Sequence, residues 1–549
     1  GDASIADAMV QLGQKELLID MQGNWGNTLT GDRAAASRYI EARLSKFALD
    51  VVFNPKTTEW QASYDGRKKE PVNLPVKFPL LLAQGAEGIA VGLSTKILPH
   101  NFIELIDASI KYLKGRSFSI LPDFLTGGIA DFSNYNDGKR GGKVRVRAKI
   151  SQLDKKTLVI TEIPFGTTTS TLIDSIVKAN EKGKIKIKKI EDNTAANVEI
   201  LVHLPPNISP DKTIDALFAF TNCENSISPL CCIIDDNKPR FIGVTEMLKT
   251  STDYTIHLLK RELEIQLYEL EEQWHFASLE RIFIENRIYR DIEEQETWKG
   301  VIKAIDIGLQ PHIKHLKRAI TEEDIVRLTE IRIKKISKFD LDKATQFIEG
   351  LEDKIAKVKE YLENLITYAI DYFKRLKSTY GKDKERKTEI RSFHDIVATK
   401  VVIRNTKLYV NREEGFIGTS LRKDEYITDC SDIDDIIVFR KDGKMIVSKV
   451  ASKTFVGKDI IHIAIFKKKD TRTVYNMMYR DGKSGASYMK RFAVTGVTRD
   501  KEYDLTTGKS NSLVHYFTAN PNGEAEAVTV LLRAVGSIKK LKWDIDFSD

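Results

Sequence analysis

The chain has 549 residues, too many for one domain, and a length of this kind predicts about three or four. Its apolar content of 42% is ordinary for a globular protein, and its apolar runs fall far short of a membrane span, which argues against an integral membrane protein. The net charge of +8 is compatible with a nucleic-acid partner without requiring one.

The cysteines and the start of the chain indicate a cellular compartment. Cys223, Cys231, Cys232 and Cys430 have the spacing of neither a zinc site nor a disulfide framework, so we expect reduced thiols in the cytoplasm. No secretory signal opens the chain. Because its first residue is Gly rather than Met, we expect a fragment or a processed protein.

Residues 31–47, GDRAAASRYIEARLSKF, have the pattern of a helix start. Asp32 is a suitable cap, and the three alanines that follow are strong helix formers. Apolar residues then recur at helical spacing, at Ala36, Ile40, Leu44, Phe47 and Val51. The pattern predicts a helix with one apolar face.

Tyr39 lies off this stripe, on a polar and mostly basic face with Arg43, Lys46 and Asp50. A phenol reacts at neutral pH only with the help of a cation, a base or a metal. Arg38 and Arg43 are suitable cations, because a guanidinium stays charged and matches phosphate oxygens. Most tyrosines are packed or half-buried residues, so the pattern alone leaves Tyr39 open as a nucleophile or as an ordinary side chain.

Twelve of the 14 prolines lie at or before Pro239, which indicates a mixed α/β first part with many loops, followed by a region able to hold long helices. Period-two alternation and helical spacing predict strands at 143–150, 156–165 and 197–204 and a helix at 169–183.

From about residue 246 the pattern is long and helical. Two heptad runs, beginning at Leu263 and Ala344, can pair as an antiparallel coiled coil, although a plain helical bundle has the same signal. Residues 296–340 between them hold a smaller helical unit, which we call the knob. The members of the runs are Leu263, Leu267, Leu270, Trp274, Ala277, Arg281, Ile284 and Ile288, and Ala344, Ile348, Leu351, Ile355, Val358, Leu362, Leu365, Ala369 and Tyr372.

The last part of the chain is predicted to be β-rich. Residues 380–391 form a charged linker, and three strand–turn–strand units follow, with glycine turns at Gly443, Gly482 and Gly523. These turns are 39 and 41 residues apart, and a period of about 40 residues is typical of propeller blades. Too few blades fit for a closed ring. The acidic DCSDIDD run, 429–435, is more simply a polar turn than a metal site.

Four ordered motifs resemble the A subunit of bacterial type IIA DNA topoisomerases. QGNWGNTLTGDRAAASRYIEARL (22–44) is similar to the active-site segment, and GDASIADAMVQLGQ (1–14) to the DNA-recognition helix before it. GAEGIAVGLSTKILPHN (85–101) and TEIPF (161–165) also match. The predicted stalk and propeller agree with this family, so the resemblance covers essentially the whole chain.

The resemblance implies roles for individual residues. The matching tyrosine of the family, here Tyr39, attacks a DNA phosphodiester and becomes linked to the 5′ end, and Arg38 assists at the phosphate. Ile89 holds the position of the isoleucine that wedges between base pairs and bends DNA; without the resemblance it would be taken for an ordinary buried isoleucine. DNA contacts fall on Asp2, Ser4, Arg33 and Arg43, and quinolone drug contacts on Ala3 and Asp7.

The resemblance also implies a larger assembly. A B subunit binds ATP and holds the Mg²⁺ ions, so we expect no metal ligands in this chain, which has no GxxxxGK[ST] phosphate loop and should be inactive alone. Two A and two B subunits would form an A2B2 enzyme acting on double-stranded DNA, dimeric through the knob, in the bacterial cytoplasm with the nucleoid and not at a membrane.

The expected architecture is a multidomain α/β protein. It has a winged-helix remnant with the tyrosine (1–70), a tower domain (71–245), an antiparallel coiled-coil stalk with its knob (246–378), a linker (379–392) and a partial DNA-binding β-propeller (393–549). The family's His-rich segment before GD is absent, and so is the basic-glycine box of gyrase, since KRGGK (139–143) lies in another domain. Topoisomerase IV is therefore favoured over gyrase. A non-catalytic DNA-binding scaffold with an inert Tyr39 remains the alternative from another class.

Overall fold

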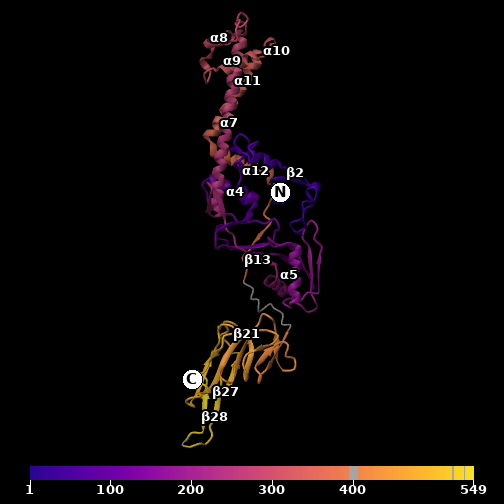
Figure 1. The fold of residues 1–549 in the computed structure, drawn as a ribbon, viewed down its shortest axis with the longest axis vertical. Coiled ribbons are helices and arrows are strands. Elements are labelled where there is room, and N and C mark those ends of the chain that lie inside the picture. Colours follow the sequence, from indigo (N-terminus) through magenta and orange to yellow (C-terminus); the bar gives the residue numbers. More distant parts are fainter. Residues whose placement is uncertain (395–405, 522, 524, 537, 549) are drawn as a thin grey trace. The chain divides into compact units, whose positions relative to one another are not determined.

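The computed structural model describes residues 1–394, 406–521, 523, 525–536 and 538–548. It divides into two compact units, each described here by itself (Figure 1). The first unit comprises 1–146, 164–166 and 225–392, and the second comprises 147–163, 167–224 and the described part of 393–549. Part of the predicted C-terminal domain, 395–405, lies outside the described residues.

The N-terminal segment is a helix followed by a two-stranded sheet. Helix α1 spans Asp2–Gln14, and strand β1 (Ile19–Gln22) pairs antiparallel with β2 (Glu41–Leu44). Between the strands, Ser37–Tyr39 forms the short 3-10 helix η1. An α-helix begins only at α2, Lys46–Val51, which the Ser45 side chain caps. The prediction of a helix starting at Asp32 is therefore wrong.

Sheet pairing outweighs local helix propensity in this segment. The backbone of β2 is paired with β1 from Ile19↔Leu44 to Gln22↔Glu41. The helix propensities of ordinary residues differ by only about a few tenths of a kcal/mol per residue, and pairing with a second strand routinely overrides such differences. Of the predicted apolar stripe only Phe47 and Val51 are buried, and both belong to α2.

Helix α4 (Phe102–Leu113) organises the core of the first unit. Asn101 caps it by accepting the Glu104 N–H, and its apolar face packs with α2 and α3 (Leu80–Gln84). The sheet β13-β8-β7-β16 contributes Ala130, Phe132, Val144 and Val146 to the same buried cluster, and three two-stranded hairpins are also present. The bounds of these strands are β13 Glu224–Ile227, β8 Lys143–Arg147, β7 Ile129–Asn134, β16 Glu389–Ile390, β3 Trp60–Ala62 with β4 Lys69–Pro71, β5 Ala86–Ala90 with β6 Leu93–Ile97, and β14 Cys232–Asp235 with β15 Lys238–Phe241.

Two long helices pack against one another as the heptad runs predict. Helix α7 spans Val244–Glu285 and α11 spans Leu341–Glu363, and the middle of α7, from Leu263 to Trp274, forms one buried cluster with α11. Trp274 Nε1 donates to Glu352 Oε1 at 3.0 Å, and Glu271, one turn earlier in α7, pairs with Lys359, two turns later in α11, at 3.4 Å. Because the contacts run in opposite directions along the two helices, the pairing is antiparallel. None of the helices in the described ranges combines the length and the apolarity needed to cross a membrane.

The returning helix is interrupted once. Asn364, with φ −114° and ψ 45°, ends α11, and α12 (Leu365–Tyr380) begins directly after it. Helix α12 packs against α4, where Lys377 Nζ pairs with Asp107 at 2.7 Å. The interruption thus separates the part of the stalk attached to the body from the part that leads to the knob.

The knob, residues 296–340, shares one apolar cluster with the end of α7, to which Leu279, Phe283 and Ile284 contribute. Its helices are α8 (Trp298–Leu309), α9 (Glu322–Thr329) and α10 (Ile333–Ser337), with the 3-10 helix η4 (Gln310–His315), and they pack on the end of α7 (Figure 1). Arg318 joins knob and stalk, since its guanidinium donates to Glu272 of α7 at 2.7 and 2.8 Å and to Asp324 of α9 at 2.7 and 3.0 Å.

The first part of the second unit is an antiparallel sheet with two helices. The strand order is β11 (Lys189–Asp192), β12 (Ile200–His203), β10 (Thr157–Glu162) and β9 (Lys149–Asp154). Helices α5 (Thr169–Glu181) and α6 (Pro210–Phe220) are capped by Thr168 and Ser209. The predicted strands and helix are confirmed, except that the 143–150 run breaks at Ala148, so β8 and β9 belong to different sheets.

The described part of the C-terminal region is built of strands. They form the sheets β19-β17-β18-β22, β23-β20-β21-β26, β25-β24-β27 and β28-β29. Their bounds are β17 Thr406–Asn411, β18 Phe416–Gly418, β19 Glu425–Cys430, β20 Asp435–Arg440, β21 Lys444–Lys449, β22 Thr454–Phe455, β23 Ile460–Phe466, β24 Val474–Arg480, β25 Ser487–Phe492, β26 Tyr503–Asp504, β27 Leu513–Asn520, β28 Ala527–Leu531 and β29 Lys542–Asp546.

Two of the three predicted glycine turns connect paired strands. Gly443 joins β20 to β21, and Gly482 joins β24 to β25. The strands on either side of Gly523 do not pair with each other, since β27 pairs with β24 and β28 with β29, so that predicted hairpin is wrong. The β-rich character is confirmed, and the propeller stays a prediction.

Candidate functional site

Tyr39 is presented at the surface at the end of η1. Its side chain is 66% exposed, and its backbone N–H donates to the Ala36 carbonyl at 2.9 Å. The guanidinium carbon of Arg38 lies 4.6 Å from the centre of the Tyr39 ring. Arg38 is exposed and has no ion pair with any described carboxylate. A phenol and an available cation therefore stand together where a large anionic substrate can reach them.

The loop between β1 and β2 fixes the backbone of Tyr39. Gly23 has φ +94°, and a Cβ at this position would lie 2.8 Å from the Tyr39 carbonyl oxygen. The ring of Trp25 is buried and anchors the loop, and the Trp25 carbonyl accepts a hydrogen bond from Gln14 of α1 at 2.8 Å. The Ala35 N–H donates to the Asn24 carbonyl at 2.9 Å. The tyrosine is thus held by a loop that is tied to α1.

The predicted basic face around Tyr39 is not formed. Arg43 remains exposed on β2 and pairs with Asp20 across the sheet at 3.1 Å. Asp50 instead contacts α12, where Arg375 donates to it at 2.7 and 3.1 Å and Tyr380 at 3.0 Å. Burial opposes ionisation of Asp50, but these hydrogen bonds outweigh it, so its pKa lies below the ordinary value. The face is absent because residues 41–44 form a strand.

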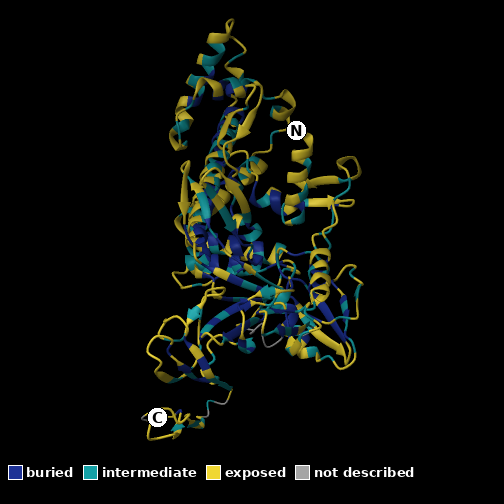
Figure 2. Cartoon of the chain, turned by 60° about the horizontal axis from the view of Figure 1, so that its bottom comes forward, coloured by how far each residue is buried: buried dark blue, intermediate teal, exposed yellow. Residues whose placement is uncertain are grey.

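Helix α1 carries four of the candidate residues on its exposed surface (Figure 2). Asp2, Ala3 and Ser4 lie in its first turn, and Asp7 follows Ala3 by one helical turn. The other end of α1 is seated on the tyrosine loop, since a Cβ at Gly13 would lie 2.6 Å from Met21 and 2.9 Å from Trp25. Arg33, also exposed, belongs to the loop itself.

Ile89 lies on an exposed hairpin and not in a core. Its side chain is 92% exposed on β5, and Val91 beside it is 103% exposed. The base of the hairpin is fixed, because Lys96 of β6 exchanges backbone hydrogen bonds with Leu230 at 2.8 and 3.1 Å. The interpretation of Ile89 as an ordinary buried residue is therefore wrong, and an apolar tip is held in solvent on a firm base.

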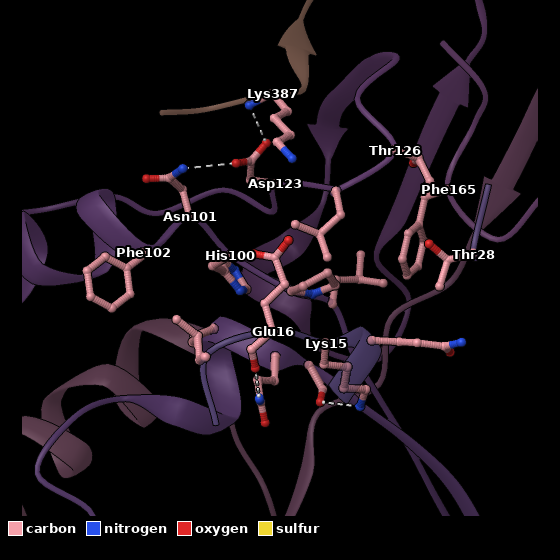
Figure 3. Close-up of a pocket in the computed structure, with 18 of the residues that line it drawn as sticks. Lys15, Glu16, Thr28, His100, Asn101, Phe102, Asp123, Thr126, Phe165 and Lys387 are labelled. Atoms are coloured by element: carbon pink, nitrogen blue, oxygen red, sulfur yellow. Dashed lines mark hydrogen bonds between the residues drawn. The ribbon is translucent and has the colours of Figure 1, made fainter. Parts of the chain in front are cut away.

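A cavity of about 430 Å³ lies between the end of α1, the base of the β5–β6 hairpin and residues 383–387 (Figure 3). Its walls include His100, whose burial lowers its pKa to about 4, so the ring is neutral at pH 7. The Thr126 hydroxyl is buried there without a hydrogen-bond partner in the described part of the chain. Tyr39 is not among the residues that line this cavity.

The carboxylates near Tyr39 do not fit a divalent cation. No group of three or more His, Cys, Asp or Glu side chains among the described residues is arranged to hold a metal. Asp32 accepts a hydrogen bond from Thr30 at 2.6 Å, and Asp20 is paired with Arg43. Mg²⁺ needs converging oxygen ligands, which these residues do not supply. In the DCSDIDD run, Asp434 accepts the Ser431 N–H, which is a turn between β19 and β20 as predicted.

Three residues that support the site were missed at the sequence level. Gly23 and Trp25 position the tyrosine loop, and Val91 extends the apolar tip beside Ile89. The paired glycines of QGNWGN, at 23 and 26, were the available signal for the loop, because closely spaced glycines indicate positive φ or close backbone approach.

Comparisons with known proteins cover both parts of the chain. The family model for the A subunit of DNA gyrase/topoisomerase IV matches residues 1–374, and the model "Topoisomerase C-terminal domain, Bacteroidota" matches 407–549. The A subunit of DNA topoisomerase 4 from Borreliella burgdorferi is 38% identical over 95% of this chain, which spans 83% of that relative.

Two gyrase relatives are more distant. The A subunit of DNA gyrase from Metamycoplasma arthritidis is 26% identical over 92% of the chain, and that from Staphylococcus aureus is 28% identical over 72%. The chain spans 62% and 47% of those two gyrase proteins. The chain therefore belongs to the family of DNA gyrase and topoisomerase IV A subunits.

Proposed function

We propose that this chain is the DNA cleavage-and-rejoining subunit of a type IIA topoisomerase, an isomerase that passes one duplex through a double-strand break in another. The observation that carries the proposal is the exposed Tyr39 beside the exposed Arg38, on a loop held by α1. Both residues lie in the region that the family model covers.

The chemistry is a balanced exchange of phosphodiesters. Tyr39 Oη attacks the phosphorus, the phosphorus–O3′ bond breaks, and a 5′-phosphotyrosyl link forms. The phenol gives up its proton and the departing 3′ oxygen takes one up, so a free 3′-hydroxyl remains. One diester replaces another, hence the 3′-hydroxyl reverses the reaction without ATP. Arg38 stabilises the negative charge that builds up on the phosphate in the transition state.

The surrounding residues position the duplex in this proposal. The exposed first turn of α1 offers Asp2 and Ser4, and Arg33 and Arg43 offer cations next to the tyrosine loop. Ile89 is the wedge, since a 92% exposed isoleucine on a fixed hairpin can enter between base pairs. Inserting an apolar side chain unstacks one base step, and the bend that results brings more DNA against the protein.

The complete enzyme requires a second kind of subunit in this proposal. The B subunit supplies both the Mg²⁺ and the ATP site, in an A2B2 assembly, as the resemblance to the family implies. The domain boundaries are those expected from the sequence, with a winged-helix remnant, a tower, a coiled-coil stalk, a dimerising knob and a partial propeller. The setting is the bacterial cytoplasm, in association with the nucleoid.

Topoisomerase IV is the favoured subclass. The topoisomerase 4 relative is 38% identical over 522 residues, whereas the gyrase relatives are 26% and 28% identical over 565 and 425 residues. The gyrase-type basic-glycine box is also missing from the sequence of the C-terminal region.

The decisive experiment is reconstitution with a topoisomerase IV B subunit, Mg²⁺ and supercoiled DNA. The wild-type mixture should yield denaturant-resistant protein–DNA adducts, and peptide mapping should place the link on Tyr39. Tyr39→Phe keeps the ring and removes only the attacking oxygen, so it should bind DNA and form no adduct. Arg38→Ala should bind DNA and form the adduct far more slowly. Adducts that persist with Tyr39→Phe contradict the proposal, and DNA binding without any adduct in the wild type supports the non-catalytic scaffold.

A further inference from the structure

The knob carries a concentrated positive charge at its surface. The eight residues Ile331–Lys338, IRIKKISK, include four cations and no acidic residue. Ile331, Ile336 and Phe339 pack against the apolar core of the knob. Of the apolar residues in this stretch Ile331 and Ile336 are partly buried and Ile333 is exposed, while Arg332, Lys334, Lys335 and Lys338 are all exposed.

These cations line a hollow, which we call the knob groove. Its volume is about 640 Å³, and it is bounded by α10, the end of α9 and the side of α7. Phe276 and Glu280 of α7 form its floor. The Arg327 guanidinium lies 3.9 Å above the centre of the Phe276 ring, which holds this cation in place without neutralising it.

The groove keeps most of its charge. Five cations line it, Arg327, Arg332, Lys334, Lys335 and Lys338, against the two carboxylates Glu280 and Glu330. Glu280 forms an ion pair with Lys335, with Nζ and Oε2 2.6 Å apart. Arg332, Lys334 and Lys338 have no ion pair with any described residue. A surface with three such cations around a hollow attracts an anion.

We propose that the knob groove binds the phosphodiester backbone of a duplex other than the one held at Tyr39. This rests on the proposed function, in which a second duplex passes through the enzyme. The four cations fall within seven consecutive residues, 332–338, of which Ile333–Ser337 are helical. A single phosphate requires converging donors, whereas DNA presents one charge per about 1.7 Å of axis, so a row of cations fits a duplex.

A second copy of the chain is a poor occupant of the groove. Two identical grooves facing each other across a two-fold axis bring like charges together, which is unfavourable. The exposed Ile333 gives one apolar contact among four cations, too little to offset that repulsion. The groove therefore acts on the transported duplex and contributes to strand passage, not to cleavage.

The test separates strand passage from cleavage in the reconstituted holoenzyme. The groove variant is Arg332→Glu/Lys334→Glu/Lys338→Glu. The matched control is Lys299→Glu/Lys303→Glu/Lys314→Glu, which changes the charge equally at exposed positions of the same knob outside the groove. For each we measure covalent adducts on a single linear duplex, the decatenation rate at several salt concentrations, and the mass by light scattering.

The groove variant should form adducts at the wild-type level but decatenate several-fold more slowly. Its decatenation rate should also depend less on salt, with a log–log slope reduced by up to about 2.7, since each phosphate contact contributes about 0.9. The control should match wild type in all three measurements. Decatenation by the groove variant at the wild-type rate, or an equal loss in the control, overturns the inference. So does a change in mass, which would make the groove a subunit interface. A wild-type enzyme that forms no adducts fails the proposed function instead.

Discussion

Gly23→Ala tests whether the loop really fixes the backbone of the nucleophile. The added methyl would lie 2.8 Å from the Tyr39 carbonyl oxygen and 3.3 Å from Ile40 Cα. Restoring a contact of about 3.5 Å moves the Tyr39 backbone by roughly 0.7 Å. A displacement of about 1 Å at a reacting group can slow a reaction by about 100-fold. We therefore expect the rate of adduct formation to fall by about 10- to 100-fold while the fold is kept.

The control for Gly23→Ala is Gly66→Ala. Gly66 also has a positive φ, +67°, but a Cβ there meets nothing within 4 Å. Both variants should lose roughly 1–2 kcal/mol of unfolding free energy from the left-handed backbone alone, measured by urea titration. Only Gly23→Ala should slow adduct formation in single-turnover reactions with the B subunit. An adduct rate at the wild-type level, or equal slowing by Gly66→Ala, refutes the role of the loop.

Four further changes test other parts of the molecule. Ile89→Ala should straighten bound DNA, measured by energy transfer between dyes on the duplex ends. Equal bending by wild type and variant contradicts the proposed role of Ile89 in bending DNA. Ala3→Ser should restore a hydrogen bond to the water of a drug-bound metal, and so strengthen quinolone action by several-fold to about tenfold. The readout is the drug concentration for half-maximal adduct formation, and an effect of Ser4→Ala in place of Ala3→Ser would assign the role to Ser4. Deleting 296–340 and joining the helices should lower the mass toward that of a monomer by light scattering; an intact dimer places the interface elsewhere. The pKa of His100, about 4 when folded against about 6.5 unfolded, means that the unfolded chain binds more protons as pH falls through this window. Acid should therefore remove up to about 3 kcal/mol of stability between these values, and His100→Gln should flatten the dependence in urea titrations at pH 7 and 5; an unchanged slope contradicts this.

The long helices were predictable because their packing signal is local. Each seam residue of α7, from Leu263 to Trp274, recurs three or four positions along the same segment, and the buried cluster contains these residues. The partners of a strand are set by distant residues. The 143–150 run therefore showed a strand pattern but not that its halves belong to different sheets.

The site was predictable in its chemistry and not in its geometry. The motif around Tyr39 and Arg38 supplied the reacting groups that we propose, yet the predicted helix was wrong because β1, about twenty residues earlier, pairs with Glu41–Leu44. Hydropathy also favours burial of an isoleucine, so the 92% exposure of Ile89 could not come from composition.

The break at Asn364 makes the stalk mechanically asymmetric. Helix α7 runs for 42 residues without interruption, whereas its partner is divided into α11 and α12. A pair of packed helices, one continuous and one interrupted, bends most easily at the interruption, because only one helix resists bending there. Between this interruption and the knob lie the 23 residues of α11, about 35 Å of helix at 1.5 Å per residue. We therefore expect the stalk to bend more easily near Asn364, where α7 is the one continuous helix of the pair, than along α11.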